Sequence, residues 1–187
     1  MAEEQLFQEI RETLKRAAGA LHDAEVPFLL GGGMAIWARG GPTTSHDLDF
    51  MVQPKDAERA LEALDTAGMR TEKPPEGWLY KAWDGDVLVD LIFAPVGEHV
   101  DEAMFARGEE LEANAVPMLV MSIEDVMVLK LKALDEHDLD YERPLEFARS
   151  LRERIDWQDV RERTNGSPFA SAFFALVEEL GIVPTSG

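Results

Sequence analysis

Three aspartates are the residues of this sequence whose type and spacing could do chemistry together. Asp47 and Asp49 stand two positions apart in an alternating polar and apolar segment, and Asp90 lies within a second apolar segment. Residues two apart in a β-strand share a face, so Asp47 and Asp49 would project side by side. Carboxylate oxygens are the ligands that Mg²⁺ prefers, and crowded carboxylates repel one another unless a cation occupies the site. The pattern therefore indicates a site for one or two Mg²⁺ ions, which Asp90 on a neighbouring strand could complete.

The same aspartates could also be strand-end and turn residues that face water. Asp-x-Asp occurs often by chance, so the spacing alone does not separate the two interpretations.

A glycine turn is the second candidate feature. Gly31-Gly32-Gly33 follows the apolar run Val26–Leu30 and precedes an expected short helix. Glycines leave backbone N–H groups unobstructed, so the turn could cradle phosphate oxygens, although a tight turn alone would have the same sequence. The turn is neither a Walker loop, because no Gly-Lys-Ser/Thr follows, nor a dinucleotide fingerprint, because Ile36 stands where the third glycine belongs.

The elements that must position these residues follow from hydrophobic periodicity. The sequence predicts helices at residues 3–24, 34–38, 55–67, 122–134, 140–154, 157–163 and 168–180, and strands at 26–30, 47–52, 78–83, 87–93 and 116–121. Asp84-Gly85-Asp86 is typical of a hairpin turn between two of the strands. We therefore expect an α/β fold with a small mixed β-sheet flanked by helices. Residues 1–121 would form the core with its N-terminal helix, and residues 122–187 a helical C-terminal region packed on it.

Composition excludes several classes of function. The 187 residues contain no cysteine, which rules out disulfides, thiolate nucleophiles and cysteine metal sites. The net charge of −19 repels polyanions, so extended nonspecific nucleic-acid binding is not expected. The acidic start and the lack of a long apolar run predict neither a signal peptide nor a membrane span, and hence a cytoplasmic protein.

Taken as a set, the motifs resemble the nucleotidyltransferase superfamily with the DNA polymerase beta-like fold. The shared features are an apolar strand, a double glycine, 13 residues from Met34 to His46, the run Asp-Leu-Asp-Phe, and a third aspartate in an apolar strand. The resemblance implies that Gly32 and Gly33 hold a triphosphate and that Asp47 and Asp49 hold metal ions. It implies for Asp90 either a metal or the proton of the attacking hydroxyl.

A weaker likeness covers residues 124–141 (EDVMVLKLKALDEHDLDY). This segment is similar to a helix of bacterial nucleotidyltransferases related to abortive-infection toxins and antibiotic nucleotidyltransferases. The resemblance implies that Lys130 or Lys132 meets a phosphate and that Asp140 lies near the base or ribose. Both lysines could instead be the solvated side of an amphipathic helix.

The resemblance implies a metal-dependent enzyme that uses two Mg²⁺ ions and moves a nucleoside monophosphate from a nucleoside triphosphate, by family habit ATP, to a hydroxyl group. The acceptor could be a small molecule, a protein side chain or a tRNA end. Relatives often carry an arginine before the aspartate pair, where this chain has Thr43, Thr44 and Ser45. That difference supports an alternative, a non-catalytic nucleotide-binding or toxin–antitoxin-type regulatory protein that keeps the fold and has a partner protein.

Overall fold

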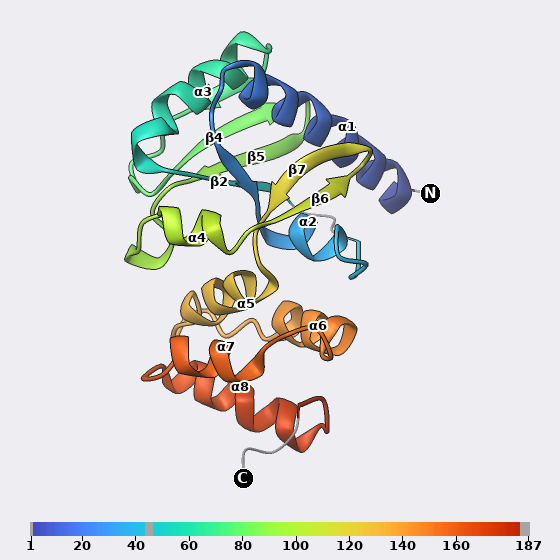
Figure 1. Cartoon of the computed structure of the whole chain (residues 1–187), viewed down its shortest axis with the longest axis vertical. Coiled ribbons are helices and arrows are strands. Elements are labelled where there is room, and N and C mark those ends of the chain that lie inside the picture. Colours follow the sequence, from blue (N-terminus) through green and yellow to red (C-terminus); the bar gives the residue numbers. More distant parts are fainter. Residues whose placement is uncertain (1, 44–46, 184–187) are drawn as a thin grey trace.

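The computed structural model describes residues 2–43 and 47–183, and it consists of a mixed sheet with helices above and below (Figure 1). The strands are β1 (Phe28–Leu30), β2 (Leu48–Val52), β3 (Arg70–Glu72), β4 (Leu79–Asp84), β5 (Val87–Ile92), β6 (Glu109–Ala113) and β7 (Val116–Val120). The α-helices are α1 (Ala2–Asp23), α2 (Gly32–Trp37), α3 (Ala57–Thr66), α4 (Glu102–Ala106), α5 (Ile123–Lys132), α6 (Glu142–Leu151), α7 (Trp157–Arg163) and α8 (Pro168–Glu179). Two short 3₁₀ turns, η1 (Pro54–Asp56) and η2 (Pro95–Gly97), complete the list.

The seven strands form one sheet in the order β3-β4-β5-β2-β1-β7-β6. The pairs β2–β5 and β1–β7 are parallel, and the remaining neighbours are antiparallel. The mixed sheet and its flanking helices confirm the predicted α/β fold class. The parallel pairing of β2 with β5 matters most for function, because it brings two of the predicted aspartates onto adjacent strands.

Helices α1 and α3 cover the upper side of the sheet in Figure 1. Ile10, Leu14 and Leu21 of α1 recur at helical spacing and have almost no exposed surface. This apolar stripe packs against the sheet, which anchors the helix by removing its hydrophobic face from water.

Helices α5 to α8 form a separate tier below the sheet (Figure 1). The chain enters this tier directly after β7, and Ser122 caps α5 by accepting a hydrogen bond from the backbone N–H of Asp125 at 3.1 Å. Phe173 and Phe174 of α8 are buried in the core of this tier. The expected helical C-terminal region is therefore present in the part of the chain that the structure describes.

Three elements escaped prediction. Strands β3 and β6 and helix α4 are short, and β6 reads Glu-Glu-Leu-Glu-Ala, a composition that disfavours strands. Backbone pairing of β6 with β7, residue by residue from Glu109–Val120 to Ala113–Val116, overrides that local preference. Within the described residues, none of the helices has the length and apolar character needed to span a membrane.

Candidate functional site

The site is built where β2 and β5 run side by side. Asp49 of β2 and Asp90 of β5 are register partners in this parallel pair. Asp47 directly precedes β2 and is exposed, whereas Asp90 is buried with 8% of its surface accessible. The neighbouring residues Phe50 and Leu91 are fully buried on the opposite face of the sheet. The alternation of the two strands thus places carboxylates on one face and core side chains on the other.

The glycine turn closes tightly over Asp49. The backbone N–H of Gly31 donates to the carbonyl oxygen of Asp49 at 2.7 Å. Gly32 has φ of +53°, and a Cβ placed on it would stand 1.7 Å from Oδ2 of Asp49. Any side chain at position 32 would therefore collide with the carboxylate, so this glycine forms part of a cradle around Asp49.

Burial raises the pKa values of both Asp49 and Asp90 by more than the nearby lysines lower them. Burial raises the pKa of Asp49 to about 6; the charge of Lys130 opposes that rise, while the charges of Asp90 and Asp47 add to it. Burial also raises the pKa of Asp90, which the ammonium of Lys81, 3.1 Å from Oδ1, partly offsets. Two carboxylates with raised pKa values in one place are typical of a functional site and attract a cation.

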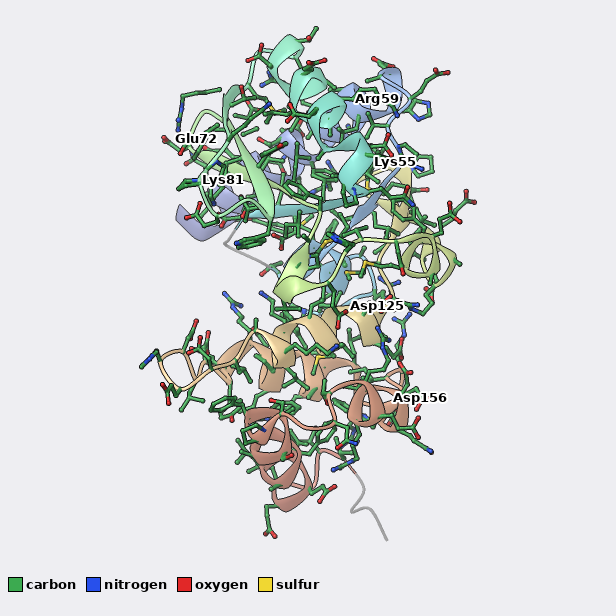
Figure 2. The ribbon with its side chains drawn as sticks, turned by 90° about the vertical axis from the view of Figure 1, so that its left-hand side faces the viewer. Lys55, Arg59, Glu72, Lys81, Asp125 and Asp156 are labelled. Atoms are coloured by element: carbon green, nitrogen blue, oxygen red, sulfur yellow. The ribbon has the colours of Figure 1, made fainter. Side chains whose placement is uncertain are left out.

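Lys81 is a site residue that the sequence analysis missed. Lys81 and Asp90 are register partners across the β4–β5 hairpin, whose strands end at the pair Asp84–Val87. The turn Asp84-Gly85-Asp86 was recognised, so counting back three residues on each strand would have found the pair. Figure 2 shows Lys81 on the sheet side of the molecule.

Two cavities meet at the aspartates. The first, called here the polar cavity, has a volume of about 370 Å³ and is lined by Gly33, Pro42, Thr43, Asp47, Asp49, Asp90, Lys130, Asp140, Arg143 and Phe147. It gathers most of the residues that the sequence singled out. Arg143 and Phe147 were missed, although they lie three and seven residues beyond Asp140, one and two helical turns along the chain. Thr44 and Ser45, part of the segment that replaces the arginine of relatives, lie outside the described residues.

The second cavity, called here the apolar cavity, has a volume of about 740 Å³. It shares Asp49, Asp90 and Lys130 with the polar cavity and is otherwise lined mainly by apolar side chains. Gly32 belongs to its wall, as does Trp78, which the sequence analysis assigned to a strand. The carboxylate pair therefore faces two compartments of different character.

The two predicted lysines of α5 are placed differently. Lys130 borders both cavities. Lys132 belongs to the lining of neither, and its Nζ pairs with Oε1 of Glu98 at 2.5 Å. Residues two apart on a helix point about 200° apart, so the two side chains cannot serve one site together.

The donor set suits a hard divalent cation, although the carboxylates are not gathered around one point. Across residues 2–43 and 47–183, no three acidic, histidine or cysteine side chains converge into a ready metal site. Asp49 and Asp90 nevertheless supply the oxygen ligands that Mg²⁺ prefers, and the Asp49 carboxylate occupies the space that a Cβ at Gly32 would take. Lys81 and Lys130 compensate only part of the charge of the pair, and a divalent cation would neutralise the remainder.

Comparison with known protein families gives one match that covers most of the chain. Residues 10–170 match the model of a family described as nucleotidyl transferase of unknown function (DUF2204). Among curated proteins, none matches the chain significantly.

Solved structures of nucleotidyltransferases share the fold. The solution structure of the antibiotic-resistance factor ANT(2″)-Ia superposes with a TM-score of 0.64 at 19% identity, over 91% of this chain and 96% of that one. The crystal structure of ANT(2″)-Ia with adenylyl-2″-tobramycin gives 0.63 at 18% identity, over 89% and 97%. A Thermotoga maritima protein assigned to the nucleotidyltransferases gives 0.53 at 16% identity, over 78% and 92%. The TM-scores establish the shared fold, and at identities below 20% the likeness extends to the fold alone.

Proposed function

Because the chain belongs to the nucleotidyl transferase family DUF2204, we propose that it transfers a nucleoside monophosphate from a nucleoside triphosphate to a hydroxyl group, with Mg²⁺ as cofactor. The observation that carries this proposal is the pairing of Asp49 with Asp90 at the point where the two cavities meet. We take ATP as the donor and the cytoplasm as the location.

The triphosphate belongs in the polar cavity. Lys130 and Arg143 both line it, whereas Lys130 is the one lysine or arginine among the described residues that line the apolar cavity. A polyphosphate beside three aspartates needs positive charge and N–H donors, and the polar cavity supplies both, including the glycine turn at Gly33. Asp140, whose Oδ1 also accepts the backbone N–H of Glu142 at 2.9 Å, would lie near the base or ribose.

In the proposed reaction, the hydroxyl oxygen of the acceptor attacks the α-phosphorus and pyrophosphate leaves. Asp90 takes the proton of that hydroxyl, and Lys81 orients its carboxylate through the 3.1 Å hydrogen bond. Asp47 and Asp49 would hold two Mg²⁺ ions. When bound, the ions supply charge stabilisation at the α-phosphate and lower the pKa of the attacking hydroxyl. Lys130 and Arg143 orient the β- and γ-phosphates as fixed cations.

Thermal unfolding with each of the four nucleoside triphosphates, with and without Mg²⁺, tests the donor site. A nucleotide at about 100 times its Kd should stabilise the protein by roughly 2.7 kcal/mol, which for a chain of this size is about 5 to 10 °C. The shift should require Mg²⁺ and should be lost in Asp49→Asn. Asp23→Asn, the same change of charge at an exposed position on α1, should leave it intact.

Pyrophosphate release decides between the enzyme and its rival. Mg²⁺-dependent release that Asp49→Asn abolishes supports transfer. A nucleotide-induced shift without pyrophosphate release, for every class of acceptor offered, would instead favour the non-catalytic regulatory role. If no nucleotide shifts the unfolding temperature, the proposed donor site is wrong.

A further inference from the structure

The apolar cavity is about twice as large as the polar cavity, 740 against 370 Å³. Cavities of roughly 300 to 1,000 Å³ are the size that holds small molecules. The apolar cavity ends at the Asp49–Asp90 pair, so whatever fills it can bring one group to the carboxylates. The reaction proposed above requires such a compartment on the side of the pair away from the triphosphate.

The walls of this cavity are mostly apolar. Met51 of β2 and Ile92 of β5 form the wall on the sheet side, and Val126, Leu129 and Ala133 come from α5 and its C-terminal cap. Among the described residues of the lining, the polar side chains beyond the aspartate pair are Glu76, His99 and Lys130. A wall of this kind binds through burial of apolar surface and offers little to a ligand that carries many charges or hydroxyl groups.

Two apolar side chains of the cavity are unusually exposed. Trp78 has 40% and Val96 has 42% of its surface accessible, and both line the cavity. The carbonyl oxygen of Trp78 accepts hydrogen bonds from the backbone N–H groups of Phe93 and Ala94, each at 3.1 Å. These bonds hold the Trp78 segment beside the segment that leads to Val96. A tryptophan fixed at the wall of an apolar cavity offers a flat surface for a ring.

Val96 is also strained. Its backbone lies at φ 46° and ψ 35°, the left-handed region that β-branched residues seldom adopt. A backbone strain of this kind costs roughly 1 to 3 kcal/mol and persists where the surroundings fix it, commonly at functional sites. Asparagine would adopt this conformation more easily than valine. The presence of valine therefore costs stability, and a contact between its apolar side chain and a ligand would account for it.

We propose that the apolar cavity binds the acceptor, and that the acceptor is a hydroxyl compound with a flat, apolar, ring-sized body. The inference rests on the proposed nucleotidyl transfer. The ring would lie against Trp78 and Val96, with the hydroxyl directed at Asp49 and Asp90. The bond between the acceptor oxygen and the α-phosphorus forms as the bond from that phosphorus to the bridging oxygen breaks. The electron pair leaves with pyrophosphate, and the hydroxyl proton passes to Asp90.

Binding of 2-naphthol to the full chain, measured by calorimetry with Mg²⁺ and α,β-methylene-ATP present, tests the proposal without turnover. We expect 2-naphthol to bind more tightly than tobramycin, a polycationic amino sugar. Trp78→Ala should weaken 2-naphthol binding about tenfold and change α,β-methylene-ATP binding by less than about twofold. With ATP in place of the analogue, the product should be the adenylyl ester of 2-naphthol.

Two further variants separate ligand contact from folding. Trp83→Ala removes a tryptophan of the same hairpin that stacks on Arg70 at 3.7 Å and is absent from the cavity lining, and it should leave 2-naphthol affinity unchanged. Val96→Asn relieves the backbone strain, so it should maintain or raise the unfolding temperature while it weakens 2-naphthol binding severalfold. A loss of affinity in a variant that is more stable cannot come from unfolding.

Three results would overturn the proposal. The first is tighter binding of tobramycin than of 2-naphthol. The second is 2-naphthol affinity that Trp78→Ala and Val96→Asn leave unchanged. The third is a Trp78→Ala variant that loses affinity for ATP but not for inorganic tripolyphosphate, because the cavity would then hold the base of the donor. A wild-type chain that binds no nucleotide with Mg²⁺ contradicts the proposed function itself, and the affinity for 2-naphthol can still be measured in it.

Discussion

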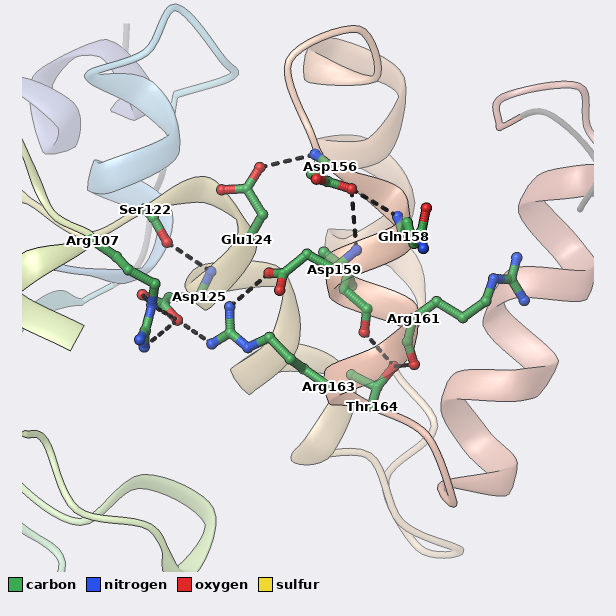
Figure 3. Close-up of polar contacts among 11 residues, drawn as sticks. Arg107, Ser122, Glu124, Asp125, Asp156, Gln158, Asp159, Arg161, Arg163 and Thr164 are labelled. Atoms are coloured by element: carbon green, nitrogen blue, oxygen red, sulfur yellow. Dashed lines mark hydrogen bonds and ion pairs between the residues drawn. The ribbon is translucent and has the colours of Figure 1, made fainter. Parts of the chain in front are cut away.

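The carboxylates of Asp49 and Asp125 have pKa values that are shifted in opposite directions. Burial alone would raise the pKa of Asp125, but hydrogen bonds from Arg107 and Arg163 hold it below its ordinary value. Arg107 is bidentate, with Nη2 to Oδ1 at 2.9 Å and Nε to Oδ2 at 3.0 Å, and Arg163 completes the cluster (Figure 3). Burial raises the pKa of Asp49 to about 6, and the charges of Lys130 and Lys81 offset only part of that rise.

The difference separates a carboxylate that fastens the fold from one kept for chemistry. Asp125 lies where the sheet meets the helical tier, and its partners come from just after α4 and from the end of α7 (Figure 2). It therefore ties the segment that follows α4 to the helices of the lower tier. Asp49 is desolvated beside Asp90 and Asp47, and Lys130 and Lys81 offset that cost only in part. Its ionised form is therefore unfavourable in the free protein and becomes favourable when a cation binds. Stability and function thus make opposite demands on the same residue type.

Removing Asp125 should give the largest loss of stability. Asp125→Ala leaves Arg107 and Arg163 without their shared partner and should destabilise the protein by about 3 kcal/mol, because a broken buried ion pair costs more than an exposed one. Chemical denaturation at pH 7.5 measures the free energy of unfolding. Asp159→Ala, which removes the other partner of Arg163 from a more exposed position, should cost less than about 1 kcal/mol. Equal losses in the two variants would show that the buried ion pairs of Asp125 stabilise the fold no more than the exposed pair of Asp159 does.

Neutralising Asp49 should raise the free energy of unfolding, whereas removing Asp125 lowers it. The ionised carboxylate carries the cost of a pKa moved from 3.8 to about 6, so Asp49→Asn should stabilise the metal-free protein at pH 7.5 by about 1 to 3 kcal/mol. Thermal unfolding with a chelator present measures the gain, and added Mg²⁺ should reduce it by stabilising the wild type alone. A destabilised Asp49→Asn variant would remove the contrast with Asp125.

The two carboxylates should also give opposite slopes of stability against pH. The folded pKa of Asp49 lies above the unfolded value, so its unfavourable contribution disappears as the pH falls from about 6 towards 4. The folded pKa of Asp125 lies below the unfolded value. Its favourable contribution is therefore full above the unfolded pKa and is lost as the pH falls through the folded pKa. Difference curves of the free energy of unfolding, wild type minus Asp49→Asn and wild type minus Asp125→Asn, should therefore slope in opposite directions. Parallel curves would contradict the assignment.

The backbone conformation of Gly32 and the position of the Asp49 carboxylate depend on each other. Gly32→Ala forces a left-handed alanine and displaces the Asp49 carboxylate, with a cost of about 1 to 2 kcal/mol for the backbone alone. Part of the remaining cost should vanish in Asp49→Ala, which removes the Oδ2 and Cγ atoms that lie 1.7 and 2.8 Å from the new Cβ and leaves the Cβ of residue 49 at 3.2 Å. A double-mutant cycle on the free energy of unfolding measures this coupling, and a coupling energy of zero would mean that the two residues do not contact.

The sequence predicted the fold class and most elements because α1 has a long apolar stripe, β2 alternates polar and apolar residues, and Ser122 with Glu124 and Asp125 marks the start of α5. It also placed Asp49 and Asp90 on strands, since apolar neighbours flank both. It could not predict Arg107 as a partner of Asp125, because the two residues are 18 positions apart and belong to different elements. Helix α4, which precedes Arg107, has only 5 residues and is too short to show a hydrophobic periodicity. Lys81 was within reach through the hairpin register, whereas the apolar cavity depends on how α5 packs below the sheet, which no local pattern specifies.

The smallest effects concern the two lysines of α5, which sharpen the contrast between site and scaffold on a single helix. Lys130 borders both cavities and opposes the rise in the pKa of Asp49, so Lys130→Ala should weaken Mg²⁺–ATP binding about tenfold. Lys132 pairs with Glu98 on the surface, and Lys132→Ala should change neither ATP affinity nor stability by more than about 0.5 kcal/mol. Calorimetric titration with ATP compares the two. Equal losses of affinity would mean that α5 acts through its overall charge, since the two substitutions remove the same charge and only position 130 faces the carboxylate pair.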